Sequence, residues 1–271
     1  VAGLMAIIFH GLGACIIVKM FGIRKNITAA LVGALVATFP TVASVMMYNY
    51  VADGYSIAFF LSTLAALYMT KEKPKFILSA VLIALSTGIY QAYITVTIML
   101  ILLKLIDEII YEHISYRIIL KKSVAMLLTG LLGVVLYSMI LKVILSIFSV
   151  GLLDYQGINS SASLSAIDIR GSLYSIKEIF IHCFFDVSKG INLYLALNIF
   201  VLAFTLSHYL KYIVINKLYK NYANLITVVI LSVMLIFGAG ALAFINAGID
   251  YHNLMLMGYA VFYLFFIILY E

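Results

Sequence analysis

Few side chains in this sequence can take part in chemistry, because only 10% of its 271 residues are charged. Asp53 follows a polar turn and could accept a proton, or it could cap a helix that starts at Gly54. Asp250 and His252 place an acid near an imidazole that could transfer a proton or bind phosphate, although a solvated turn has the same residues. Lys142 lies within an apolar stretch, from which it could reach toward a bound lipid phosphate or toward ordinary headgroups.

Metal-binding patterns are missing from the sequence. Neither the two cysteines, Cys15 and Cys183, nor the histidines His10, His113 and His208 show the spacing of metal ligands. No cofactor therefore follows from the sequence, and a divalent cation stays an open alternative.

The elements that position the polar residues must be membrane-spanning helices. Hydrophobic residues make up 65% of the chain, whereas soluble domains are about half apolar. Backbone polar groups inside a bilayer must be satisfied internally, which leaves helices or a closed barrel. The stretches 28–48, 123–147 and 225–245 are apolar on every face and lack the alternation of barrel strands. We predict an all-α fold, a polytopic transmembrane helical bundle that forms one domain over residues 1–271.

The number of crossings within 76–106 decides the orientation of everything after it. This stretch is long for one span and short for two. If it forms a hairpin, either re-entrant or made of two short helices, 13 cations share one side and three (Arg170, Lys177 and Lys189) lie on the other. A single crossing divides them nine to seven, so the positive-inside rule favours the hairpin. The 13 predicted cytoplasmic cations are Lys19, Arg24, Lys25, Lys71, Lys73, Lys75, Lys104, Arg117, Lys121, Lys122, Lys211, Lys217 and Lys220.

This orientation gathers the remaining polar residues on the extracytoplasmic face. Because the cations sit in short loops between spans, nucleic acid is not an expected partner. A polar cavity at the boundary of the bilayer is the expected site. The segments that we expect to meet there are 49–55, 90–93, 148–190 and 246–253.

The outer loop 148–190 is long enough to suggest a function. It opens with Asp154 and Gln156, which could contact a substrate or simply form a turn. Apolar residues then recur at helical spacing, so we expect an amphipathic helix over about 166–186, preceded by a capping box from Ser165 to Asp168. Such a helix could plug the ends of the spans or cover a substrate.

Several motifs in these outer segments resemble a known family. They are Thr38 to Ser44 (TFPTVAS), Tyr50 to Tyr55 (YVADGY), Leu85 to Tyr93 (LSTGIYQAY) and Tyr155 to Asn159 (YQGIN). In these motifs the chain resembles the glucosyl transferase II (GtrII-like) family of polytopic membrane glycosyltransferases. The resemblance covers most of the chain, and the run Gly-Ile-Tyr-Gln-Ala is its most distinctive part.

The resemblance implies a C-type glycosyltransferase fold and a reaction. A glucosyl or other hexosyl residue would pass from a polyprenyl-phosphate donor in the membrane to a glycan acceptor on the cell surface. Such chemistry needs a carboxylate to take the acceptor's proton and groups that hold the leaving phosphate, and Asp53 is the candidate base. Gln91 could bond a sugar hydroxyl or satisfy the backbone of the broken helix. The expected substrate-binding residues are Tyr50, Tyr55, Tyr90, Gln91, Tyr93, Asp154, Gln156, Asp250, His252 and Lys142.

Other functions stay open at this point. A transporter or flippase of lipid-linked saccharides, a glycan polymerase and a non-catalytic scaffold subunit would also have many spans. Enzymes with the implied fold usually carry key acidic residues in an outer loop near the N-terminus, whereas this sequence starts at Val1 inside an apolar run. We therefore expect that upstream spans are missing and that the best base could lie outside this sequence.

Overall fold

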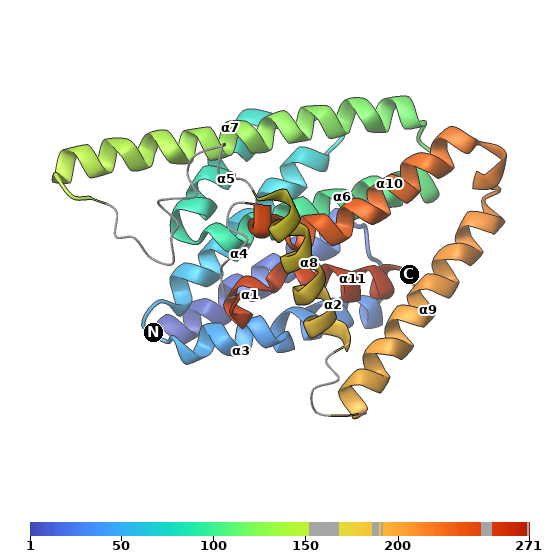
Figure 1. The fold of residues 1–271 in the computed structure, drawn as a ribbon, viewed down its shortest axis with the longest axis horizontal. Helices are drawn as coiled ribbons and strands as arrows, with labels where there is room; N and C mark the ends of the chain where they lie inside the picture. The colour runs from blue at the N-terminus through green and yellow to red at the C-terminus, as the bar shows by residue number, and fades with distance from the viewer. Residues whose placement is uncertain (152–167, 186–189, 191, 245–250, 270) are drawn as a thin grey trace.

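The computed structural model describes residues 1–151, 168–185, 190, 192–244, 251–269 and 271. These residues form a helical bundle, which confirms the predicted all-α fold (Figure 1). Five of the helices, α1, α4, α7, α9 and α10, are long and apolar enough to cross a membrane. The helices are α1 (Ala2–Met20), α2 (Asn26–Thr38), α3 (Pro40–Met47), α4 (Ala52–Thr70), α5 (Phe76–Ile89), α6 (Ile94–Ile110), α7 (Tyr116–Phe148), α8 (Ile169–Phe185), α9 (Leu193–Ile215), α10 (Tyr222–Ala239) and α11 (Ala260–Ile268), with short 3₁₀ helices η1 (Gln91–Tyr93), η4 (Leu218–Lys220), η5 (Ala241–Phe244), η6 (Asn253–Met255) and η7 (Met257–Tyr259).

The helices α2 and α3 together form a bent pair, which is apolar and long enough for a broken span or a re-entrant loop. They meet at Phe39 with a bend of 44°. The cause is Pro40, the first residue of α3, because proline has no N–H to donate and forces the preceding residue out of the helical region. Phe39 accordingly has an extended ψ of 138°. The break in this apolar stretch therefore lies at Pro40.

The stretch 76–106 forms a hairpin of two short helices, α5 and α6, joined by η1. Serine hydroxyls fix its geometry against α4. Ser86 donates to the carbonyl of Ala58 at 2.8 Å, and Ser79 donates to that of Ala65 at 3.3 Å, so α5 runs antiparallel to α4. Thr97 on α6 donates to the carbonyl of Ser62 at 3.1 Å. The stretch therefore forms a hairpin of two short helices, as predicted, and not one continuous helix.

The loops that carry most of the cations meet at one end of the bundle, which we call the cationic end. It is formed by the connections 21–25, 71–75, 111–115 and 216–221. Asn216 joins two of them by donating to the carbonyl of Ile110 at 2.9 Å, and Tyr116 N–H donates to Asn224 at 2.9 Å. Glu271 accepts hydrogen bonds from the backbone N–H groups of Arg24 and Lys25 at the same end. The 13 cations that the charge count grouped together therefore lie toward this end of the bundle, because the hairpin brings the chain back to it.

The opposite end, the rim end, contains the turn 48–51, the hairpin tip 90–93, the start of α9 and the segment 251–259. Thr41 on α3 donates to the carbonyl of Asn253 at 2.7 Å, and Leu254 packs with Ala52 and other small residues. Segments of the rim end that are far apart in sequence therefore lie together.

The helix α8 crosses in front of α11 in the view of Figure 1, and the two helices pack through Phe180 and Phe262, whose ring centroids lie 5.6 Å apart. It occupies most of the stretch where an amphipathic helix was expected. Asp168 caps it, because its carboxylate accepts from the N–H of Gly171 at 2.9 Å. Ser165, from which a capping box was expected, lies outside the described residues. On its buried face, Ser172 donates to the carbonyl of Ala243 at 2.7 Å.

Candidate functional site

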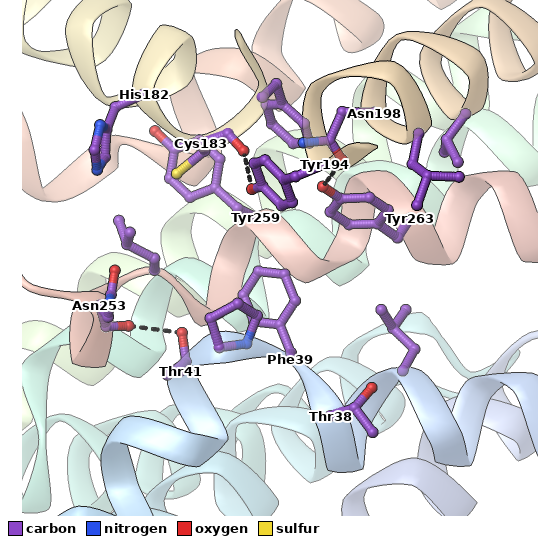
Figure 2. Close-up of a pocket in the computed structure, with 16 residues that line it drawn as sticks. Thr38, Phe39, Thr41, His182, Cys183, Tyr194, Asn198, Asn253, Tyr259 and Tyr263 are labelled. Carbon is purple, nitrogen blue, oxygen red and sulfur yellow. Dashed lines mark hydrogen bonds between the residues drawn. The ribbon is translucent and has the colours of Figure 1, made fainter. Parts of the chain in front are cut away.

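A cavity of about 360 Å³ lies at the rim end, beneath the C-terminal turn of α8 (Figure 2). We call it the Asn198 cavity. Its lining comes from the α2–α3 break, α8, α9 and the segment leading into α11. The lining residues are Leu35, Thr38, Phe39, Pro40, Thr41, His182, Cys183, Phe184, Tyr194, Leu197, Asn198, Val201, Asn253, Leu256, Tyr259 and Tyr263.

The break at Pro40 forms one wall of this cavity. Because α2 ends at Thr38 and α3 leaves in a new direction, the side chains of Phe39 and Thr41 face the cavity from below in the view of Figure 2. The bond from Thr41 to Asn253 holds this wall against the segment that crosses the rim. The TFPT part of the first motif therefore lines the cavity.

Polar groups from α9 and α11 cover the opposite wall. Tyr263 donates to Asn198 Oδ1 at 2.7 Å, and Tyr194 donates to the carbonyl of Cys183 at 2.6 Å (Figure 2). Two buried polar atoms, Asn198 Nδ2 and Tyr259 Oη, have no hydrogen-bond partner within the described residues. A buried donor without a partner costs about 1–3 kcal/mol. The wall can therefore gain stability from a ligand that brings acceptor oxygens, after a small side-chain adjustment.

The rest of the lining is apolar and reaches the membrane-facing surface. Leu35 on α2 and Leu197 and Val201 on α9 form the sides, and Leu197 is 53% exposed. The cavity is therefore open between two helices whose outer surfaces face lipid. An amphipathic molecule fits this lining, with its apolar part between α2 and α9 and its polar part against Asn198 and the tyrosines.

A second cavity, of about 380 Å³, lies on the other side of the C-terminal half of α8. We call it the Glu178 cavity. It shares His182 and Leu256 with the Asn198 cavity. Burial raises the pKa of Tyr251, which also lines it, to about 12, so this hydroxyl is neutral at physiological pH and can donate a hydrogen bond. The lining residues are Tyr174, Ser175, Glu178, Ile179, His182, Tyr251 and Leu256.

Three of the residues predicted for substrate binding form an aromatic cluster at the hairpin tip. The rings of Tyr55 and Tyr90 lie 4.6 Å apart, and those of Tyr90 and Tyr93 lie 5.5 Å apart. Tyr93 is completely buried against Phe59, and its hydroxyl has no hydrogen-bond partner within the described part of the chain. The motifs around Tyr55 and Tyr90 therefore meet in space. The packing of these rings also accounts for their positions without a ligand.

Asp53 lies in the first turn of α4, close to the rim. The helix starts at Ala52 and its N-cap is Val51, so the alternative that Asp53 caps a helix starting at Gly54 is wrong. Its Oδ1 accepts from the N–H of Gly54 at 2.9 Å, which satisfies a free donor of the first turn. Neither cavity has Asp53 among its lining residues.

The other predicted site residues are spread along the rim. Tyr50 is 80% exposed and contacts the edge of Tyr48. Gln91 donates to the hydroxyl of Tyr137 on α7 at 2.9 Å, so its amide joins two elements of the bundle. His252 is exposed just before η6, and Lys142 is exposed on α7. Three more predicted residues, Asp154, Gln156 and Asp250, lie outside the described residues.

Sequence reasoning missed three residues that line the two cavities, Asn198, Glu178 and His182. Asn198 is an amide in the middle of an apolar span, a kind of residue that marks functional sites in membranes, and this signal could have found it. Glu178 and His182 are four residues apart on an amphipathic helix, which places them on one face. No group of three or more His, Cys, Asp or Glu side chains in the described part of the chain could hold a metal ion.

Comparison with known proteins gives one match. The family model described as Glucosyl transferase GtrII matches residues 1–270, which is nearly the whole chain. No curated protein and no solved structure matches it.

Proposed function

The chain belongs to the glucosyl transferase GtrII family, and from this premise we propose which substrates it uses and where. It transfers a glucosyl residue from a polyprenyl-phosphate donor to a cell-surface glycan. The reaction takes place at the rim end, on the extracytoplasmic side of the membrane.

The Asn198 cavity is the observation that carries this proposal. Its apolar sides open toward lipid between α2 and α9, while Asn198 and Tyr259 offer unpartnered polar atoms inside. A polyprenyl-phosphate sugar has the same division into an apolar chain and a polar head. The bilayer therefore supplies the donor from the side, and the amide and hydroxyl groups bind its head.

The distribution of charge supports the sidedness. Loops rich in lysine and arginine stay on the cytoplasmic side of membranes, and these loops form the cationic end. The cavity lies at the other end of the bundle, where a glycan exported from the cell is accessible. In this proposal, the tyrosines of the hairpin tip and the predicted outer residues contact the substrates from the rim. No resident cofactor is required, and a divalent cation could accompany the phosphate.

Transfer can be measured in membrane vesicles that contain the full-length protein. Radiolabelled polyprenyl-phosphate glucose and the surface glycan of the producing cell are added, and we expect label in the glycan. Movement of the labelled lipid across the vesicle without transfer would favour a flippase and contradict the proposal. Growth of a glucose homopolymer would favour a polymerase.

The cavity itself is tested by Asn198→Leu, which keeps the branched shape of the side chain and removes both polar atoms. Loss of about 1.4 kcal/mol of binding raises the KM for the donor about tenfold. The matched control is Ser207→Ala on the same helix, whose exposed hydroxyl bonds only to nearby groups of α9, the carbonyl of Phe204 and the ring of His208. An unchanged KM in Asn198→Leu would remove this cavity as the donor site.

A further inference from the structure

The C-terminal half of α8 carries an acid and an imidazole on one face, Glu178 and His182. Residues four apart on a helix have Cβ atoms about 6 Å from each other. Both side chains line the Glu178 cavity, and Ser175, one turn earlier, lines it as well. Lys177 Nζ lies 3.4 Å from a carboxylate oxygen of Glu178 on the exposed side of the helix.

The two cavities meet at His182 and Leu256, which line both of them. The lining of the Asn198 cavity is mainly apolar and opens toward lipid, whereas the Glu178 cavity has a carboxylate, an imidazole and three hydroxyl groups. Two neighbouring cavities of such different character suit two substrates that must meet. His182 lines both cavities, and at this junction a leaving phosphate and an attacking hydroxyl would come together.

We propose that the Glu178 cavity binds the hydroxyl-bearing sugar of the acceptor glycan and that Glu178 is the catalytic base. This inference rests on the proposed function. It assigns the base to α8, in place of the Asp53 expected from the sequence.

The reaction step balances with these groups. The acceptor oxygen forms a bond to the anomeric carbon of the donor sugar as the bond from that carbon to the phosphate oxygen breaks. The electron pair of the broken bond stays on the polyprenyl phosphate, and the proton of the acceptor hydroxyl passes to the Glu178 carboxylate. His182, at the junction, donates a hydrogen bond to the departing phosphate oxygen.

Position favours Glu178 over Asp53. Glu178 lines a cavity next to the proposed donor site, whereas Asp53 lines neither cavity. The Asp53 carboxylate also accepts a hydrogen bond from the first turn of α4, so it already has a structural role there. Asp168 precedes Glu178 in the sequence, and its carboxylate already caps α8.

Transfer by vesicles containing Glu178→Gln tests the assignment. A carboxylate base contributes about 10²–10⁴-fold, so we expect kcat to fall by at least a hundredfold while donor binding stays unchanged. We expect Glu178→Asp to recover part of the rate. The acidic limb of the pH profile of kcat/KM, which reports the base, is expected to disappear in Glu178→Gln. The control is Glu72→Gln, an exposed carboxylate at the cationic end.

The outcomes separate the two proposals. If the unmodified protein transfers no label, the proposed function fails before the variant is compared. If the unmodified protein transfers label and Glu178→Gln keeps the rate and the pH profile, the base is not Glu178. Loss of rate in Asp53→Asn alone would return the role to Asp53. Loss of donor binding together with the rate in both Glu178 variants would show a structural role and would also overturn the inference.

Discussion

Two glycines of α7 provide a sharp test of how this helix is held against the bundle. A Cβ added at Gly133 would lie 2.7 Å from Ile83 Cγ2 and 3.0 Å from the carbonyl oxygen of Ala80. A Cβ added at Gly130, one turn earlier, would meet nothing within 4 Å. The methyl group added by a change to alanine is therefore crowded at Gly133 and meets no neighbour at Gly130.

The expected magnitude follows from these distances. Alanine favours a helix over glycine by about 1 kcal/mol, and this gain is the same at both positions. At Gly133 the added methyl group also overpacks the contact with α5, which costs about 1–3 kcal/mol, because the Ala80 carbonyl belongs to the helix backbone and cannot rotate away. We expect Gly130→Ala to stabilise the protein slightly and Gly133→Ala to be less stable than Gly130→Ala by about 1–3 kcal/mol.

Denaturant unfolding of the detergent-solubilised protein, followed by circular dichroism, measures both free energies under one condition. In the difference between the two free energies of unfolding, the gain in helix propensity cancels because both variants share it, and the packing penalty at Gly133 remains. Equal free energies of unfolding for the two variants would refute the close contact between α5 and α7. Because α7 also carries Tyr137, which binds Gln91 at the hairpin tip, this contact positions part of the rim.

Two further predictions concern buried groups. The Glu108 carboxylate is 4% exposed and bonds to Lys122 at 2.6 Å, so Lys122→Met leaves it buried without that partner, and we expect the free energy of unfolding to fall by about 3 kcal/mol. The double variant Lys122→Met/Glu108→Leu should largely restore this stability. A Lys122→Met variant as stable as the unmodified protein would contradict the prediction. Burial raises the pKa of the Cys183 thiol to about 12, so at pH 8 it stays protonated. In a Cys15→Ser background we expect iodoacetamide to label Cys183 far more slowly than the exposed thiol of Lys177→Cys, and equal rates would contradict this.

Much of the fold could be predicted because it depends on properties that add up along the chain. Apolar composition required helices in a membrane, and the count of cations chose the hairpin over a single crossing. The structure explains why that count worked, since Ser79 and Ser86 bond to α4 in antiparallel register and return the chain to the rim. The bend at Pro40 follows from local covalent geometry and needed no knowledge of the fold.

The site was harder to predict because its cavities depend on tertiary contacts. Asn198 stands in a long apolar run and Glu178 on an amphipathic helix, so each looked like part of a span or of a covering helix. Asp53 stood out because it was the acid nearest a turn, but α4 begins one residue before it and its carboxylate serves that first turn. Charge near a turn is visible in a sequence, whereas the space between two helices is not.

The Asn198 cavity arises from helices of unequal length. The helix α11 has nine residues, about 14 Å, because the segment before it crosses the rim as η6 and η7 and enters the bundle late. Its neighbours α2 and α9 flank it, but the break at Pro40 turns α3 toward η6, so the space beside Phe39 is left to side chains and to the bilayer. The short helix α11, the broken pair α2–α3 and the crossing helix α8 thus leave one opening that faces lipid and a second opening that is lined by Glu178. Since His182 lines both, a donor held by its chain and an acceptor held by its hydroxyls could react without the bundle changing its packing.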